Sequence, residues 1–216
     1  DLHSFPTRRS SDLHIGAVAV GTDGFFAPGT QSFWSAVPDE HLVDVGGARS
    51  RLPLPAARQV YTHIAAAGQQ RLGDVSNALT LANTTYITDA LLGTGAPGPT
   101  RDDVINWARG HDVRDEDGDG DTTEIARRMG DPLHGRPAVV TYAQAGRDPN
   151  LPEKDTVVFL PTNDGFLHAV GGWSDTSTGG GRELWAFAPE ELLPRLKDLY
   201  ANPYMEIGRA SCRERV

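Results

Sequence analysis

Residues 112–124, which read DVRDEDGDGDTTE, form the most chemically distinctive stretch of the chain. Aspartates stand at alternate positions, with glycines at 118 and 120 between two of the pairs: Asp115, Asp117, Asp119 and Asp121. Alternation in a turning loop brings carboxylate oxygens around one point, and Gly120 can adopt the positive φ that a sharp turn needs. Hard divalent cations, calcium above all, are bound by six to eight oxygens in such loops. The stretch therefore predicts a calcium-binding loop.

The spacing resembles an EF-hand loop only in part. With Asp115 at position one, Gly120 stands at position six, as in an EF-hand. Position twelve is Ala126 where an EF-hand has glutamate, and Glu124 comes two positions too early. We therefore expect a calcium loop of another type, with Asp112 as a weaker ligand candidate. The predicted metal ligands are Asp115, Asp117, Asp119, Asp121 and Glu124.

Two other interpretations of the acidic stretch stay open. An acidic run can be a solvated surface without a ligand. Asp121 and Glu124 also have the spacing of a helix N-cap and its N3 partner, which would open a helix from Ile125 to Met129. That capping role is compatible with calcium. It would place the acidic loop between two helices, because a helix is also expected before it.

Both ends of the chain resemble translated sequencing adapter. SSDL stands near the start of the chain and EIGRA near its end. The core of a DNA sequence that can encode one is the reverse complement of the core of a DNA sequence that can encode the other. Selection on a protein does not explain such a relation. We therefore treat residues 1–13 and 206–216 as adapter artefact and about His14–Met205 as the natural segment. Cys212 falls in the artefact, so this segment holds no disulfide and no thiolate zinc site.

Charge and hydropathy exclude several classes of partner. The chain has 20 basic and 29 acidic residues, a net charge of −9. Nucleic acid and anionic lipid both require a basic surface, so neither is an expected partner. No apolar run is long enough to cross a bilayer, so direct membrane insertion is not expected.

The first half of the segment predicts few regular elements. His14–Val20 and Gln59–Ala65 have the apolar and β-branched composition of short strands. Gly93–Pro99 has the composition of a linker. Thr100 then predicts a helix N-cap, with Asp102 and Asp103 in the favourable first turn, and Gly110 predicts the helix end.

The second half predicts a small sheet. Four short strands are expected at residues 138–143, 156–161, 166–170 and 183–187, with a tight turn at Asn163–Asp164–Gly165 and a long turn at Gly171–Gly181. A helix with one apolar face is expected at Pro189–Asn202. Four antiparallel strands make about one blade of a β-propeller. The predicted fold is thus mainly β with short helices, a partial β-propeller of about one blade plus part of an upstream β-rich region; a small open antiparallel sheet is the alternative.

Four motifs in this order resemble a known family: NWARGHDVRDEDGDGDTTE, MGDPLHGRPAVVTY, TNDGFLHAV and ELWAFAPEELL. Together they look like the PilY/PilC-type adhesin and assembly proteins of type IV pili. The likeness covers residues 100–202 well and 25–92 more loosely. It suggests an upstream β-rich region with its linker at residues 14–99, then the helix, the acidic calcium loop and the start of the propeller at residues 100–205.

The resemblance implies a function as well as a fold. Members of the family carry a C-terminal β-propeller with calcium-binding acidic loops at the pilus tip or outer surface of Gram-negative bacteria. They act with pilins and minor pilins in pilus biogenesis, oppose retraction, and support twitching motility and cell adhesion to host or abiotic surfaces. Some members carry an Arg-Gly-Asp tripeptide, but here His111 interrupts it between Gly110 and Asp112. Integrin binding through it is not expected.

Two rival functions remain. TNDGFLHAV followed by GRELWAF also resembles a blade of quinoprotein dehydrogenases, which bind pyrroloquinoline quinone, with Gly181, Glu183 and Trp185 in partial agreement. A structural adhesion module without metal is the other. No catalytic residues are nominated, because the histidines lack metal-ligand spacing and no nucleophile or phosphate-binding motif occurs. We therefore expect a protein that is not an enzyme.

Overall fold

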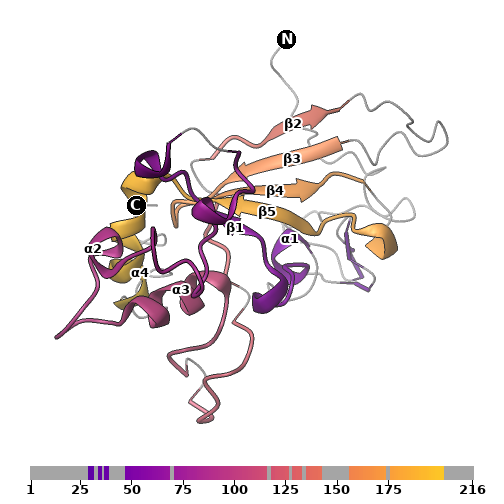
Figure 1. The fold of residues 1–216 in the computed structure, drawn as a ribbon. Coiled ribbons are helices and arrows are strands. Elements are labelled where there is room, and N and C mark those ends of the chain that lie inside the picture. Colours follow the sequence, from indigo (N-terminus) through magenta and orange to yellow (C-terminus); the bar gives the residue numbers. More distant parts are fainter. Residues whose placement is uncertain are drawn as a thin grey trace, which may run out of the picture. The chain divides into compact units, whose positions relative to one another are not determined.

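The computed structural model describes ten ranges of the chain: residues 29–31, 34–35, 37–38, 47–68, 71–115, 118–126, 128–132, 135–142, 156–173 and 176–201. The strands are β1 (Val60–Tyr61), β2 (Ala138–Thr141), β3 (Thr156–Pro161), β4 (Leu167–Gly171) and β5 (Glu183–Phe187). The α-helices are α1 (Gly47–Ser50), α2 (Asp89–Leu92), α3 (Arg101–Arg109) and α4 (Leu196–Ala201). Short 3-10 helices lie at Pro55–Ala57, Ala65–Ala67, Val75–Asn77, Thr176–Thr178 and Glu190–Arg195. The fold is mixed α/β (Figure 1).

The five strands form one sheet in the order β1-β5-β4-β3-β2. The four strands of the second half are therefore neighbours in chain order, and the sequence predicted all four within a few residues. β1 pairs parallel with β5, in the register Val60 to Ala186 and Tyr61 to Phe187. The amides of Ala186 and Ala188 donate to the carbonyls of Gln59 and Tyr61 at 2.8 and 2.9 Å, which fixes this register. The strand expected at residues 59–65 is thus only two residues long.

The chain divides into two compact units, which are described separately. The first unit comprises residues 1–52, 138–158 and 170–183, and the second comprises residues 53–137, 159–169 and 184–216. Each unit is assembled from three separate stretches of chain. Each unit includes residues from before and from after Pro99, the position at which the sequence suggested a domain boundary.

The hydrophobic core lies in the second unit. Its fully buried side chains come from β1, the turns before α2, helices α2 and α3, and the C-terminal helical segment; they include Val60, Leu79, Ile87, Leu92, Val104, Ile105, Leu193 and Leu196. Helix α3 contributes most to it, because its apolar residues recur at helical spacing and face the other elements. This helix is also the element from which the acidic loop emerges.

Helix α3 has the boundaries that its sequence predicts. The Thr100 hydroxyl accepts from the Asp103 amide at 3.2 Å and the Asp103 carboxylate accepts from the Thr100 amide, which together form a capping box. The helix ends at Gly110, whose φ of 99° lies in the region that glycine tolerates best. The acidic loop therefore starts from a helix whose two ends are both fixed.

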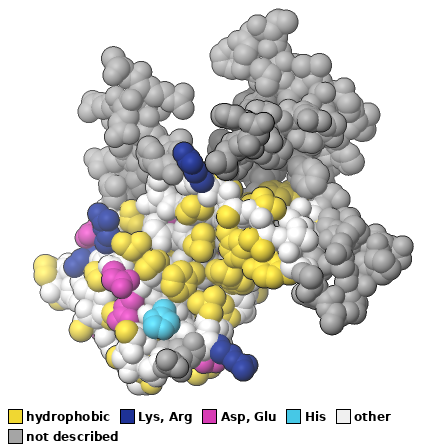
Figure 2. Space-filling model, turned by 90° about the horizontal axis from the view of Figure 1, so that it is seen from above, with side chains coloured by type: hydrophobic (Ala, Val, Ile, Leu, Met, Phe, Trp, Pro, Cys, Tyr) yellow, Lys and Arg dark blue, Asp and Glu magenta, His cyan; other side chains and the backbone are white. Residues whose placement is uncertain are grey.

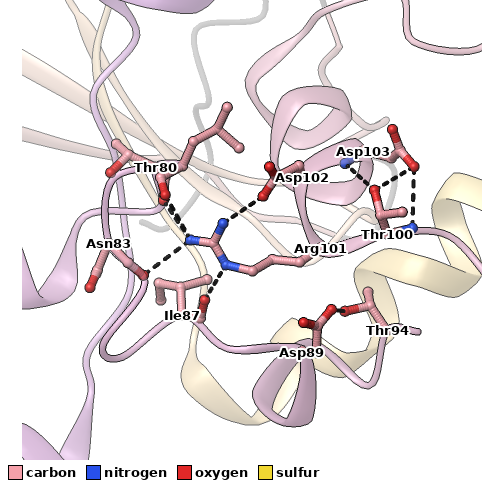
Figure 3. A network of polar contacts seen from close by, with 10 residues as sticks. Thr80, Asn83, Ile87, Asp89, Thr94, Thr100, Arg101, Asp102 and Asp103 are labelled. Carbon is pink, nitrogen blue, oxygen red and sulfur yellow. Dashed lines mark hydrogen bonds and ion pairs between the residues drawn. The ribbon is translucent and has the colours of Figure 1, made fainter.

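Arg101 ties the first turn of α3 to the preceding chain (Figure 3). Its guanidinium donates to the carbonyls of Ile87, Thr80 and Asn83, the last two at 3.2 and 3.1 Å, and forms an ion pair with Asp102 at 2.6 Å. Since these carbonyls lie in irregular turns, the arginine supplies hydrogen bonds that a helix or sheet would otherwise give. The segment from 80 to 87 is thereby held against α3.

The linker-like segment Gly93–Pro99 is a compact turn within the second unit. Its Gly95 amide donates to the Pro99 carbonyl at 3.1 Å, and its Gly98 amide donates to the Gly95 carbonyl at 2.7 Å.

The C-terminal segment is helical, as predicted, but it begins as a 3-10 helix that contains Pro194 and becomes α-helical only at Leu196. Proline lacks the amide that a regular α-helix needs there.

The first unit contains a glycine-rich turn that is enclosed by aromatic side chains. Trp34 donates from its indole to the Trp173 carbonyl at 3.0 Å, and a Cβ on Gly181 would lie only 2.4 Å from Cγ of Trp34. Arg51 donates to the carbonyls of Gly180 and Thr176 at 2.8 and 2.7 Å. The Gly171–Gly181 turn is therefore tightly packed.

Strand β2, also in the first unit, is exposed along its whole length. Val139, Val140 and Tyr142 are among the exposed large hydrophobic residues, and Figure 2 shows hydrophobic side chains gathered on the face that it presents. Within the ranges described above, no helix is long and apolar enough to cross a membrane. The strand expected at His14–Val20 and both adapter-like ends lie outside those ranges.

Candidate functional site

The acidic loop is closed at its base by a short antiparallel contact. His111 and Ile125 form an isolated β-bridge, the Asp112 amide donates to the Glu124 carbonyl at 3.0 Å, and the Ala126 amide donates to the Gly110 carbonyl at 2.9 Å. Ile125 therefore belongs to an extended return strand, and the helix expected from Ile125 to Met129 is absent from the described part of that range. The prediction of a loop between two helices was wrong, because backbone pairing with the incoming chain replaces the second helix.

The middle of the loop turns sharply where the sequence places glycine. Gly118 and Gly120 have φ values of 78° and 90°, and Asp115 has a φ of 51° that non-glycine residues seldom adopt. The Gly120 amide donates to Oδ1 of Asp115 at 3.0 Å. The residues at positions one and six of the EF-hand-like pattern are therefore directly joined, with the Asp115 carboxylate turned toward the loop backbone.

The next two aspartates form small turns of their own. The Asp121 amide donates to Oδ1 of Asp119 at 2.8 Å, and the amide and hydroxyl of Thr123 donate to Oδ1 of Asp121 at 2.8 and 2.6 Å. The Thr123 hydroxyl, and then its amide, hold the pKa of the Asp121 carboxyl below its usual range. Asp121 thus accepts from the amide two residues on, as a helix N-cap does from N2, but the chain then pairs with the incoming side of the loop and no helix follows within the described residues.

Three of the five predicted ligands are exposed on the loop surface. Asp119, Asp121 and Glu124 are exposed, Asp115 is half-buried, and Asp117 lies outside the described residues. Among the residues that the structure describes, no three acidic or histidine side chains converge on one point. The donor set of carboxylate oxygens on a tightly turned loop fits a hard cation in its chemistry. The calcium site stays a prediction.

Asp112, the weaker ligand candidate, is buried, with 6% of its surface exposed. Its Oδ1 lies 3.8 Å from Nη2 of Arg128, on the chain that leaves the loop. The Arg128 guanidinium also lies over the Trp107 ring of α3, 4.8 Å from the ring centre. Asp112 therefore takes part in fixing the loop to helix α3, and its charge is directed at an arginine.

A second arginine fixes the entry to the loop. The Arg114 guanidinium lies 5.7 Å from the centre of the Tyr200 ring of α4 and donates to the Tyr200 carbonyl. Tyr200 in turn meets Trp107 edge to face, with ring centres 6.2 Å apart. Burial, and then the charge of Asp103, raise the pKa of the Tyr200 hydroxyl, while Arg114 and Arg128 act in the opposite direction. Sequence reasoning missed both arginines, although basic residues that flank an acidic run were a visible signal.

Two of the family-like motifs contact each other in the second unit. The Gly130 amide donates to Oδ2 of Asp164 at 2.8 Å, and the Asn163 amide donates to the Asp131 carbonyl at 2.9 Å. The Thr162 hydroxyl donates to Oδ1 of Asp164. A Cβ on Gly130 would lie 2.6 Å from Cγ of Asp164, so this contact requires glycine. The MGDP and TNDGF motifs thus form one structural joint.

His168 lies next to that joint and is fully buried. Its Nε2 is 3.1 Å from the Thr162 hydroxyl, and its ring packs against Phe166 with ring centres 6.0 Å apart. Trp185, one of the residues shared with quinoprotein blades, packs against Phe159 at 5.8 Å. These contacts give His168 and Trp185 packing roles in the sheet.

In comparisons with known proteins, no family model, no curated protein and no solved structure matches the chain.

Proposed function

We propose that the chain is part of a calcium-binding, PilY/PilC-type protein of the type IV pilus, which supports pilus extension, surface attachment and twitching motility. The proposal rests on the four motifs quoted above and on the way their residues are used. The MGDP and TNDGF motifs pack together through Gly130 and Asp164. The acidic motif follows directly on α3 as a loop with a paired base. The partners would be pilins, minor pilins and a host or abiotic surface, at the outside of a Gram-negative cell.

Calcium would be held by the carboxylates of the loop, with its charge cancelling their mutual repulsion. Carboxylates a few ångströms apart repel each other, and a bound divalent cation reverses the sign of that interaction. Gly118 and Gly120, both with positive φ, turn the loop backbone sharply between the aspartates. The candidate ligands are Asp115, Asp117, Asp119, Asp121 and Glu124.

The fold proposal is the entry to a β-propeller. Strands β2, β3, β4 and β5 are consecutive neighbours in one sheet, which is the arrangement of a propeller blade. A propeller typically closes with four to eight blades, so further strands would have to come from elsewhere in the protein. Parallel strand β1 beside β5 is an addition to the blade pattern.

The observation that supports this function best is the acidic loop itself, with its paired base and turned tip.

The test is to replace Asp119 and Asp121 by asparagine in the gene of a piliated bacterium that carries this protein. We expect loss of calcium-dependent surface attachment and twitching, with the protein still present. The matched control removes two exposed acids elsewhere, by Glu191→Gln with Asp198→Asn, and should behave as wild type. Unchanged attachment and twitching in the loop variant would refute the proposal.

A further inference from the structure

Five side chains connect the acidic loop to helices α3 and α4 through a series of four contacts. Asp112 and Arg114 lie on the incoming side of the loop, Arg128 on the outgoing side, Trp107 on α3 and Tyr200 on α4. Asp112 meets Arg128 at 3.8 Å, and Arg128 lies over Trp107 at 4.8 Å. Trp107 meets Tyr200 at 6.2 Å, and Tyr200 lies under Arg114 at 5.7 Å. We call this set the aromatic clamp.

The aromatic clamp joins parts of the chain that are remote in sequence. Arg114 and Tyr200 are 86 residues apart, and the guanidinium bonds to the backbone of α4 as well as facing its ring. Trp107 is buried, so the Arg128 contact is shielded from water, where a cation–π interaction is strongest. Arg128, Trp107 and Tyr200 each contact two other members, and Asp112 and Arg114 stand at the two ends of the series. Loss of one contact therefore weakens the position of the next.

We propose that the aromatic clamp makes the base of the acidic loop and the end of helix α4 open and close together. When α4 separates from α3, the Arg114 guanidinium loses its contacts with the Tyr200 ring and the Tyr200 carbonyl. The incoming side of the loop is then released. When the loop base opens, Arg128 leaves Trp107 and uncovers the ring against which Tyr200 packs. The coupling is reciprocal, as any equilibrium coupling between two sites must be.

This inference extends to calcium, and that extension rests on the proposed function. An ion that holds the loop in its closed form would also hold α4 in place. The C-terminal end of the described chain would then respond to an ion bound at the loop. Helix α4 is six residues long and ends in the exposed Ala201, and exposed element ends open at a lower free-energy cost than the core does.

The coupling can be tested without calcium by amide hydrogen exchange on the 216-residue chain. Tyr200→Leu removes the ring and keeps an apolar side chain. We expect the bridge amides of Asp112 and Ala126 to exchange about fivefold faster, the effect of losing one cation–π contact of ordinary strength. The Thr62 and Leu79 amides, which bond to the carbonyls of Asn77 and Val60, should be unchanged. Asp198→Asn, on the exposed side of the same helix, is the matched control.

The reverse substitution tests reciprocity and guards against a variant that fails to fold. Arg128→Met removes the charge over Trp107 and should speed exchange of the α4 amides at Tyr200 and Ala201 about as much. Bridge amides that keep their wild-type rates in folded Tyr200→Leu would overturn the inference. So would an equal acceleration of every amide in the unit, because that result indicates general destabilisation.

Calcium chloride then separates the inference from the proposed function. Slower exchange in the loop and in α4 of the wild type, with the α4 response lost in Tyr200→Leu, is the expected result. Slower exchange in the loop alone would overturn the coupling and leave calcium binding intact. No change in the loop at any calcium concentration would refute the proposed function, while the calcium-free comparison would still decide the coupling.

Discussion

Two aspartate-containing turns of the second unit use their carboxylates in different ways. In the turn after β3, the carboxylate of Asp164 accepts from the Gly130 amide, the Thr162 hydroxyl and the Phe166 amide, and so joins distant segments. In the acidic loop, the carboxylates of Asp115, Asp119 and Asp121 accept from amides within the loop, two to five residues away. The carboxylate of the first turn links two segments of the unit, whereas these three carboxylates bond to the backbone of their own loop.

The difference shows which acidic residues are available to a ligand. Asp164 is half-buried and its position is fixed by groups on both sides, so it contributes to stability at its own site. Asp119 and Asp121 are exposed, with short-range bonds that exchange readily for others. Asp164 is distinguished by one distant partner, the Gly130 amide 34 residues away. An acidic residue with a binding role has local partners that a ligand can replace.

The largest expected effect comes from removing the carboxylate with distant partners. Asp164→Ala leaves the Gly130 amide without its acceptor, and we expect it to lower the free energy of unfolding by about 1–3 kcal/mol. Asp119→Ala, on the exposed loop, should change that free energy by no more than about 0.5 kcal/mol. Urea unfolding of both variants measures the contrast. Equal effects would remove the distinction between the two turns.

A smaller effect is expected on the pKa of Asp121 in the acidic loop. Thr123→Val removes the hydroxyl that, with the Thr123 amide, keeps the pKa of Asp121 low. A carboxyl whose pKa is depressed by folding stabilises the protein above its unfolded-state pKa, and this contribution is lost as the pH falls through the folded value. In Thr123→Val we expect the Asp121 titration to move up toward the usual range near pH 4. Carbon-13 NMR of the side-chain carboxyl measures it, and an unmoved titration would show that the hydroxyl bond is absent in solution.

The sequence predicted the elements whose signals are local. Thr100, Asp103 and Gly110 define the two ends of α3 through contacts within one turn of helix. The strands at 156–161 and 183–187 have the predicted boundaries, because β-branched and aromatic residues there are bounded by turns. These elements required no knowledge of distant partners.

Features that depend on distant partners were not predictable in the same way. The parallel pairing of β1 with β5 joins residues that are more than a hundred positions apart. The chain after the acidic loop returns to pair with Gly110 and Asp112, and so the cap signal at Asp121 opens a turn in place of a helix. The Arg114 contact depends on where α4 packs, and the Arg128 contact depends on where the outgoing chain meets α3; the local sequence specifies neither.

Calcium binding by the acidic loop is tested most directly by isothermal titration calorimetry of the 216-residue chain. The proposal predicts saturable binding of one calcium ion per chain, with a dissociation constant of roughly 10⁻⁴ to 10⁻³ M, the range of extracellular calcium modules. Asp119→Asn with Asp121→Asn should abolish it, and Glu191→Gln with Asp198→Asn should leave it unchanged. No saturable heat in the wild type, or the same binding in the loop variant, would contradict the proposal.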